Sequence, residues 1–407
     1  MTSVYIETHG CTLNQSEAEE ITNQLEGHKF VEHADDAEVL ILNACVVIET
    51  TEKRILKRIT ALCDDLDNRQ LVVTGCMTES LRDRLHVLCP RLVFVPSGLV
   101  ASHINSRFKC ETTSQRQCGI TTRVKIAEGC HGSCSYCIVR LVRGKIKSRR
   151  LEDVVRDVDR SVQRGAKQIL LAAQDAGAYG LDVGYRLPDL IGAICALEYD
   201  FKLRIGMMNI ASIQDAFEEL LTAFECAKVY KFLHVPVQSG SDRILSLMDR
   251  GHTVSDFVRC VSKFRQKYKH GTISTDFIVG FPTETDADFQ LTRQLLRDTK
   301  PLKVNITRFS PREGTTAVSL GPVTPRIVKD RSRILTAEHH RVAHEQNRKC
   351  IGKKCTALAV EKGKNRSTIL YNDSYRPIVV PSVLPLGTNH AVKVIEATRT
   401  YLLGILD

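Results

Sequence analysis

Three cysteines, Cys130, Cys134 and Cys137, form a C-x3-C-x2-C cluster directly after a predicted strand. Three thiolates within eight residues can ligate three irons of a [4Fe–4S] cube and leave the fourth iron without a protein ligand. That open iron can chelate the amino and carboxylate groups of S-adenosylmethionine. A zinc knuckle is the alternative, but it needs a fourth ligand nearby, and His131 lies too close to Cys130. The spacing therefore favours an iron–sulfur cluster.

A second set of cysteines is spread over the first part of the chain. Cys11, Cys45 and Cys76 each follow a predicted strand by one to three residues, at separations of 34 and 31 residues. One βαβ unit takes about 30 residues, and loops at the carboxyl ends of parallel strands share one edge of the sheet. Gly10 and Gly75, which precede two of these cysteines, allow a close approach of backbone to a ligand. The pattern favours a second metal site, with three independent buried thiols as the alternative.

The other cysteines show no such spacing. The total of fifteen is odd, and the strand-like Val4–Ile6 follows the first residues without the features of a secretion signal. We therefore expect a cytoplasmic, reducing environment, which argues against a disulfide framework. Cys350 and Cys355 could bind zinc, but most of these thiols are expected in the core. The nine are Cys63, Cys89, Cys110, Cys118, Cys195, Cys226, Cys260, Cys350 and Cys355.

The elements that must position the first cysteine set alternate between strands and helices, which predicts an open parallel α/β sheet with right-handed crossovers. The predicted strands cover residues 4–8, 38–43, 71–74 and 92–95. The predicted helices cover about 16–26, 51–62 and 79–88. We assign this N-terminal domain to residues 1–112.

The alternation resumes in a central domain assigned to residues 116–346. Six βα units are fewer than the eight of a closed barrel, so we expect an incomplete (β/α)6 barrel. Its predicted strands are 123–127, 168–172, 203–207, 231–235, 274–279 and 303–308. Short strands separated by Gly, Pro, Asn and Asp then predict a small antiparallel β-barrel over residues 347–407.

The charge balance favours a polyanionic partner. Lysine and arginine exceed aspartate and glutamate by 57 − 47 = 10. The sequence has no run of about 18 apolar residues that could cross a membrane. A basic run follows the Cys130–Cys137 loop, where contact with phosphates is favoured over an ordinary solvated surface. The run comprises Arg140, Arg143, Lys145, Lys147, Arg149 and Arg150.

The C-x3-C-x-aromatic-C pattern resembles the motif of the radical S-adenosylmethionine superfamily, with Tyr136 at the aromatic position. The resemblance implies that Tyr136 lies beside the cluster and the adenine of the cofactor. Further segments in both domains resemble methylthiotransferases, and the C-terminal barrel resembles their RNA-binding TRAM domain. The segments are YIETHGCTLNQSEAE (5–19), LNACVV (42–47), TGCM (74–77), RGKIKSR (143–149), HVPVQSGSDRIL (234–245) and DFIVGFPTET (276–285).

This resemblance implies two [4Fe–4S] clusters, one held by each cysteine triad, and two molecules of S-adenosylmethionine per turnover. The segment QDAGAYG (174–180) most resembles the archaeal and eukaryotic branch, which adds a 2-methylthio group to N6-threonylcarbamoyladenosine at position 37 of tRNA. Ala176, His9 and Arg150 depart from that branch, but none is a cluster cysteine. The implied partners are this tRNA, an electron donor and a sulfur donor. The alternatives are action on isopentenyladenosine or a ribosomal protein, and a non-catalytic RNA-binding iron–sulfur scaffold.

Residues at the ends of barrel strands are expected to line the cofactor site, with ordinary structural hydrogen bonding as the alternative. These residues are Gln174, Asp175, Gln238, Ser239 and Asp276. A substrate with a threonylcarbamoyl group brings a carboxylate, which needs a charge-assisted partner in an apolar pocket. Of the cations Arg143, Arg204 and Arg308 near strand ends, we favour Arg308 or Arg143 for this role.

Overall fold

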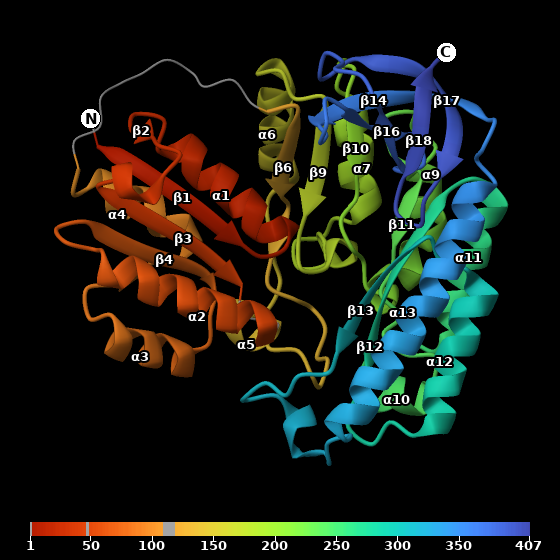
Figure 1. Cartoon of the computed structure of the whole chain (residues 1–407), viewed down its shortest axis with the longest axis horizontal. Coiled ribbons are helices and arrows are strands. Elements are labelled where there is room, and N and C mark those ends of the chain that lie inside the picture. Colours follow the sequence, from red (N-terminus) through yellow and green to blue (C-terminus); the bar gives the residue numbers. More distant parts are fainter. Residues whose placement is uncertain (1, 46–48, 109–118) are drawn as a thin grey trace.

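The computed structural model describes residues 2–45, 49–108 and 119–407. It contains an N-terminal α/β sheet, a central half-barrel and a small C-terminal barrel (Figure 1). The expected joint between the first two domains, at residues 112–116, lies outside the described residues. None of the described helices combines the length and the apolar character that a membrane crossing requires.

The N-terminal sheet is parallel throughout, in the strand order β2-β1-β3-β4-β5, as the alternation predicts. Its strands are β1 (Ser3–His9), β2 (Lys29–Phe30), β3 (Val39–Cys45), β4 (Gln70–Cys76) and β5 (Val93–Phe94). Its helices are α1 (Thr12–Gln24), α2 (Glu49–Asp64), α3 (Glu79–Leu88) and α4 (Val100–Asn105). The short β2 and helix α4 were not anticipated from the sequence.

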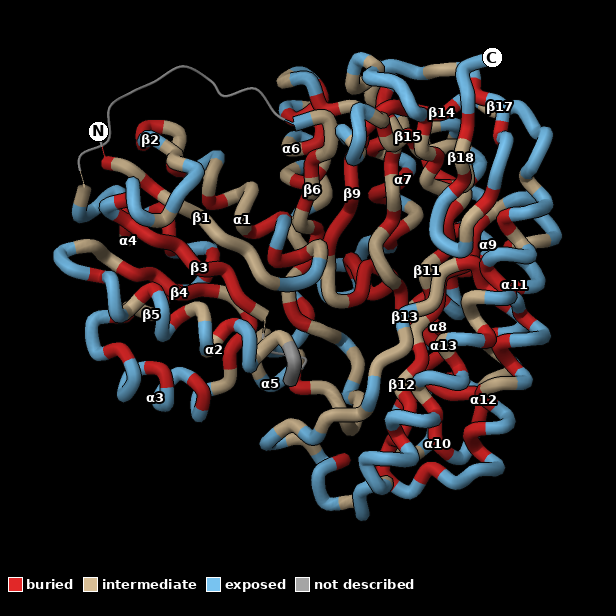
Figure 2. The backbone as a smooth tube through the Cα atoms, viewed as in Figure 1, coloured by how far each residue is buried: buried red, intermediate tan, exposed pale blue. Residues whose placement is uncertain are grey.

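Helices cover both faces of this sheet, so its central strands are buried along almost their whole length (Figure 2). Leu40 and Leu42 of β3 pack with α2 and α3, whereas Val39 and Ile41 pack with α1 and α4. This two-sided burial explains why β3 is a continuous apolar run in sequence.

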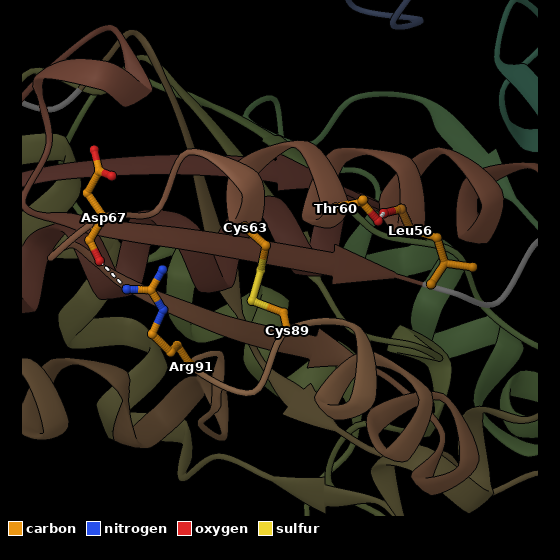
Figure 3. Close-up of a disulfide and its surroundings, with 6 residues drawn as sticks. All are labelled: Leu56, Thr60, Cys63, Asp67, Cys89 and Arg91. Carbon is orange, nitrogen blue, oxygen red and sulfur yellow. Dashed lines mark hydrogen bonds between the residues drawn. A yellow bond between two sulfur atoms is a disulfide. The ribbon is translucent and has the colours of Figure 1, made fainter.

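A disulfide joins Cys63 near the end of α2 to Cys89 directly after α3 (Figure 3). The expectation of a chain without disulfides is therefore wrong for this pair. Helices α2 and α3 cover the same face of the sheet, which brings the two Cα atoms to 6.0 Å although 26 residues separate them. An odd total of cysteines argues against complete pairing but cannot exclude one bridge.

The central domain is an open barrel of two three-stranded parallel sheets, β6-β9-β10 and β11-β12-β13. A bridge between Leu203 and Val229 joins the two sheets. The strands are β6 (Thr121–Lys125), β9 (Gln168–Ala172), β10 (Lys202–Arg204), β11 (Phe232–His234), β12 (Thr272–Val279) and β13 (Lys303–Arg308). The incomplete six-stranded barrel predicted from the sequence is confirmed.

Helices surround the half-barrel and enclose its core. They are α5 (Val139–Arg143), α6 (Leu151–Gln163), α7 (Leu187–Cys195), α8 (Ile210–Ile213), α9 (Phe217–Ala223), α10 (Asp242–Leu247), α11 (Val254–Lys267), α12 (Asp286–Thr299) and α13 (Pro325–Arg348). A short antiparallel pair, β7 (Ala127–Glu128) with β8 (Lys147–Ser148), flanks the loop that carries Cys130, Cys134 and Cys137.

The C-terminal barrel is closed, in the order β14-β15-β16-β18-β17. Its strands are β14 (Lys354–Lys362), β15 (Thr368–Asn372), β16 (Pro377–Val380), β17 (Asn389–Ala397) and β18 (Leu402–Leu406). Four neighbouring pairs are antiparallel, as expected, but β16 and β18 run parallel. Directions cannot alternate around a closed ring with an odd number of strands, so one parallel pair is unavoidable.

This small barrel docks on the end of the half-barrel where the strands begin. Asp373 pairs with Lys202 at 2.6 Å, at the start of β10. Tyr375 stacks on Tyr371 and packs against Phe232 at the start of β11, with ring centroids 4.5 and 5.1 Å away. The loop with Cys130, Cys134 and Cys137 lies at the opposite end of the half-barrel. It follows β7, which comes directly after the carboxyl end of β6.

Candidate functional site

The structure brings the three N-terminal cysteines together at the carboxyl edge of the first sheet. Cys45 and Cys76 end neighbouring strands and lie directly opposite each other in register. Cys11 caps the start of α1, two residues after β1. The thiol of Cys76 contacts that of Cys45, and this contact together with burial raises the pKa of Cys76. The pKa of the Cys11 thiol is also raised, mainly by burial and in part by the nearby Cys76.

The glycines that precede two of these cysteines face protein rather than an open ligand space. Gly75 has a φ of +103°, and a Cβ there would lie 2.2 Å from the carbonyl oxygen of Ala44. A Cβ at Gly10 would lie 2.4 Å from the side chain of Asn14. Asn14 accepts a hydrogen bond from Cys11 at 3.3 Å and donates to Asn43 at 3.1 Å. Both positions therefore exclude any larger residue.

Arg143 connects this edge to the central domain. Its Nε donates to the Cys76 Sγ at 3.0 Å, and its Nη2 donates to Glu17 at 2.9 Å. Its Nη1 donates to Glu128 at 2.7 Å. Burial alone would lower the pKa of Arg143, but its bonds with Glu17 and Cys76 raise that pKa, so the guanidinium stays charged. Arg143 is thus occupied within the protein, away from any substrate carboxylate.

The second triad lies on the loop between β7 and α5. A Cβ placed on Gly132 would lie 3.7 and 3.8 Å from the sulfurs of Cys130 and Cys134, so both thiols face one common space. Cys137 interacts electrostatically with both, and burial raises its pKa to about 12. Arg250, which the sequence reasoning missed, donates from Nη1 to the Cys134 Sγ at 3.2 Å.

The two triads fit iron–sulfur clusters by the chemistry of their donors. Each offers three thiols, the ligands that such clusters take, and each thiol of a cube binds a different iron. Within the described residues, no three His, Cys, Asp or Glu side chains gather around a single metal-ion position.

Gln174, at the end of β9, stands out among the expected cofactor residues. Its side-chain oxygen and nitrogen are both buried without a hydrogen-bond partner in the part of the chain that the structure describes. Buried polar groups are almost always satisfied, so a bound polar group is expected beside this amide.

Asp175 and Ser239 are held by the protein itself. Asp175 is 1% exposed and accepts hydrogen bonds from Ser212 at 2.6 Å and from the backbone N–H of Asn209 at 2.9 Å. Burial raises its pKa. Asn209 in turn accepts from Arg250 at 3.1 Å, which links Asp175 to the cysteine loop. Ser239 is fully buried and accepts from the backbone of Ser241 at 3.2 Å.

A cavity of about 180 Å³ lies between the cysteine loop and the ends of β12 and β13. Asp276, on its wall, accepts hydrogen bonds from Asn305 at 2.7 Å and His234 at 3.1 Å. The exposed side chain of Arg308 makes no hydrogen bond or ion pair with any residue that the structure describes. The lining includes Tyr136, Cys137, Gln238, Asp276, Arg308 and Arg312.

One residue of the cavity lining, Arg312, contacts the N-terminal domain. Arg312 pairs with Glu52 of α2 at 2.5 Å, while its Nε and Nη2 are buried without a partner among the described residues. Arg204, the third cation considered from the sequence, lies elsewhere, 5.1 Å from the ring centroids of Phe232 and Tyr375 beneath the C-terminal barrel. Of the three cations considered from the sequence, Arg308 is therefore the one that lines the cavity with a side chain free to bind a substrate carboxylate.

Comparison with known proteins identifies the family. The radical SAM superfamily profile matches residues 124–296, and that of the uncharacterized protein family UPF0004 matches residues 3–95. A probable threonylcarbamoyladenosine tRNA methylthiotransferase of Archaeoglobus fulgidus is 38% identical over 99% of this chain and 98% of its own. The chain belongs to the threonylcarbamoyladenosine tRNA methylthiotransferase family. The human member is 30% identical over 98% of this chain and 73% of its own.

Solved structures show that this family member shares the radical SAM fold. The methyltransferase TsrM from Kitasatospora setae, solved with cobalamin and a [4Fe–4S] cluster, aligns with a TM-score of 0.56 at 12% identity, over 78% of this chain and 77% of its own. The cobalamin-dependent radical enzyme OxsB, solved with S-adenosylmethionine, aligns with a TM-score of 0.51 at 12% identity, over 83% of this chain and 56% of its own.

The unpartnered amide of Gln174 yields a first prediction. Gln174→Leu should weaken binding of S-adenosylmethionine at least 10-fold but leave the free energy of unfolding of the ligand-free protein unchanged or slightly higher, because it removes unsatisfied polar atoms. Equilibrium binding and denaturant unfolding measure the two effects. Gln168, at the start of β9, donates to Tyr230 at 2.8 Å, so Gln168→Leu should instead destabilise the protein. Unchanged affinity in Gln174→Leu would rule out a cofactor role.

Proposed function

We propose that the protein converts N6-threonylcarbamoyladenosine at position 37 of tRNA to its 2-methylthio derivative. The observation that carries the proposal is the placement of two cysteine triads on facing edges of two domains, joined by the contact of Arg143 with Cys76. Similarity over nearly the whole chain to an archaeal protein named for this reaction supports it. Each triad is proposed to hold one [4Fe–4S] cluster.

The chemistry explains the need for such clusters. The C2–H of adenine is neither acidic nor electrophilic enough for ordinary acid–base or nucleophilic replacement. When bound, the clusters and two molecules of S-adenosylmethionine supply a hydrogen-abstracting radical and a methylated sulfur, with an electron donor and a sulfur donor from outside the chain.

The protein's own groups bind, orient and exclude water. We assign Tyr136, Gln238 and Asp276 to the cofactor because they line the cavity beside the cysteine loop. We add Gln174 because its buried amide atoms lack a partner among the described residues. Asp175 and Ser239 act as positioning residues in this proposal, since their polar atoms are held within the protein. The pairing of Arg312 with Glu52 holds the N-terminal domain against the cavity and limits the entry of water.

Arg308 is the proposed partner of the threonylcarbamoyl carboxylate. It is exposed on the cavity wall and lacks an internal partner among the described residues, whereas Arg143 is engaged by Glu17, Glu128 and Cys76. A carboxylate that enters this partly apolar cavity would gain a charge-assisted hydrogen bond from it. An isopentenyl group would gain nothing from such a cation.

Iron analysis tests the two clusters. Replacement of Cys130, Cys134 and Cys137 by Ala should halve the reconstituted iron and abolish reductive cleavage of S-adenosylmethionine, because the open iron is lost. Replacement of Cys11, Cys45 and Cys76 should also halve the iron but leave cleavage measurable. A single cluster, or stoichiometric zinc, in the anaerobically purified wild type would contradict the proposal.

A competition tests the substrate. With reconstituted enzyme and dithionite, threonylcarbamoylated tRNA should be methylthiolated faster than isopentenylated or unmodified tRNA. Arg308→Met should lower the rate on the threonylcarbamoylated tRNA about 10-fold or more, since a hydrogen bond to a charged group contributes about 1.5–3 kcal/mol. Its rate on unmodified tRNA should not change. If isopentenylated tRNA reacts at an equal or higher rate, the substrate is isopentenyladenosine and the proposal is wrong.

The C-terminal barrel is proposed to hold the tRNA. Residues 349–407 contain nine Lys and Arg against four Asp and Glu, a local excess of 9 − 4 = 5. Lys362 and Lys364 are exposed at the turn between β14 and β15. Their charge and position suit contact with phosphates, at a distance from the chemistry.

Salt dependence tests this surface. Lys362→Gln with Lys364→Gln should weaken tRNA binding and reduce the slope of log K against log salt by about 0.7–0.9 for each phosphate that these lysines neutralise in the wild type. Uncoupled cleavage of S-adenosylmethionine should persist. Lys29→Gln, at the far edge of the N-terminal sheet, provides the matched control. If the double variant and the wild type show the same slope of log K against log salt, Lys362 and Lys364 do not contact tRNA phosphates.

A further inference from the structure

We propose that Arg143 is a positioning residue for the N-terminal cluster: it donates a hydrogen bond to the Cys76 sulfur from the neighbouring domain and thereby raises the reduction potential of that cluster. The inference rests on the two-cluster function proposed above. It goes further, because it makes the electronic properties of one cluster depend on the docking of the two domains.

The contact is short, buried and held from several sides. The Nε of Arg143 lies 3.0 Å from the Cys76 Sγ. The Arg143 side chain is 5% exposed, and that of its partner Glu17 is fully buried. Ser97 donates to Glu17 at 2.9 Å, which fixes the carboxylate that orients the guanidinium. The contact between Arg143 and Cys76 is therefore shielded from solvent in the docked protein.

The position of Arg143 in the chain links the two triads. Helix α5 begins two residues after Cys137 and ends at Arg143. The helix lies beside β4, the strand that ends at Cys76. One short segment thus starts at a proposed ligand of one cluster and ends on a proposed ligand of the other. Any movement that separates the domains removes this donor from Cys76.

Arg250 makes a similar contact with a cysteine of the second triad, but its other partners differ from those of Arg143 in charge and in domain. Arg250 donates to Cys134 at 3.2 Å and is held by Asn209 and the carbonyl of Pro236, at 3.1 and 2.9 Å. Those partners are neutral and belong to the same domain as Cys134. Arg143 instead crosses the domain boundary and is held by the carboxylates of Glu17 and Glu128.

Hydrogen bonds to the sulfurs and the local charge are established determinants of cluster potential. One-electron reduction adds negative charge to the cluster, and an N–H donor on a ligand sulfur stabilises that charge. The effect is larger where solvent is excluded, since the local dielectric constant is low. Loss of Arg143 should therefore make the N-terminal cluster harder to reduce.

The experiment is a redox titration of the reconstituted full-length protein, followed by electron paramagnetic resonance. Glu17→Gln alone keeps the donor and measures the effect of neutralising the carboxylate. Arg143→Met with Glu17→Gln then removes the donor without leaving an unpaired buried carboxylate at Glu17. Arg143→Lys keeps the buried cation and serves if the double variant does not fold. Arg140→Gln alters an exposed arginine of the same helix and is the control.

Relative to Glu17→Gln alone, Arg143→Met with Glu17→Gln should lower the midpoint potential of the N-terminal cluster. Arg143→Lys, which loses the Nε donor but keeps the cation, should lower that potential by less relative to the wild type. Both should leave the potential of the Cys130–Cys134–Cys137 cluster unchanged. Arg140→Gln should change neither potential. Unchanged potentials at full iron content would overturn the inference while the two-cluster function stands. A wild type with only one cluster would instead refute the proposed function itself.

Discussion

The buried ion pair between Glu17 and Arg143 is the interaction on which the arrangement of the two catalytic domains depends. Both side chains are almost completely removed from water, at 0% and 5% exposure. Removal of one partner from such a pair typically costs about 3–5 kcal/mol, because the other charge is left uncompensated. While the domains are docked, each of these two charges therefore depends on the other for compensation.

Three further pairs between α1 and the central domain surround this one. Glu19 pairs with Arg123 at 2.6 Å, Glu20 with Lys125 at 3.0 Å, and Glu26, just beyond α1, with Arg164 at 2.9 Å. These pairs are more exposed, and each contributes little to stability alone. Together they hold α1 along β6 (Figure 1).

The sequence predicts what is repeated locally and misses what is brought together over long distances. The apolar run of β3 and the spacing of Cys130, Cys134 and Cys137 are local patterns, and the sheet, the half-barrel and the loop after its first strand follow from them. The strand periodicity also anticipates the meeting of Cys45 and Cys76. The contact of Arg143 with Cys76 spans 67 residues, and no local period encodes it. The same holds for Arg250 against Cys134, for Arg312 against Glu52, and for the disulfide between α2 and α3.

The docking of the C-terminal barrel on the strand starts separates the proposed RNA-holding surface from the chemistry by the length of the half-barrel. Strand β12, from Thr272 to Val279, has eight residues, which span about 26 Å at roughly 3.3 Å per residue. An RNA held at both ends must reach across this distance. If the C-terminal barrel holds RNA as proposed, the length of the half-barrel sets a minimum size for a substrate bound at both ends. A free nucleoside can reach only one end, whereas a larger RNA can reach both. Selection by size would then act independently of the shape of the base pocket.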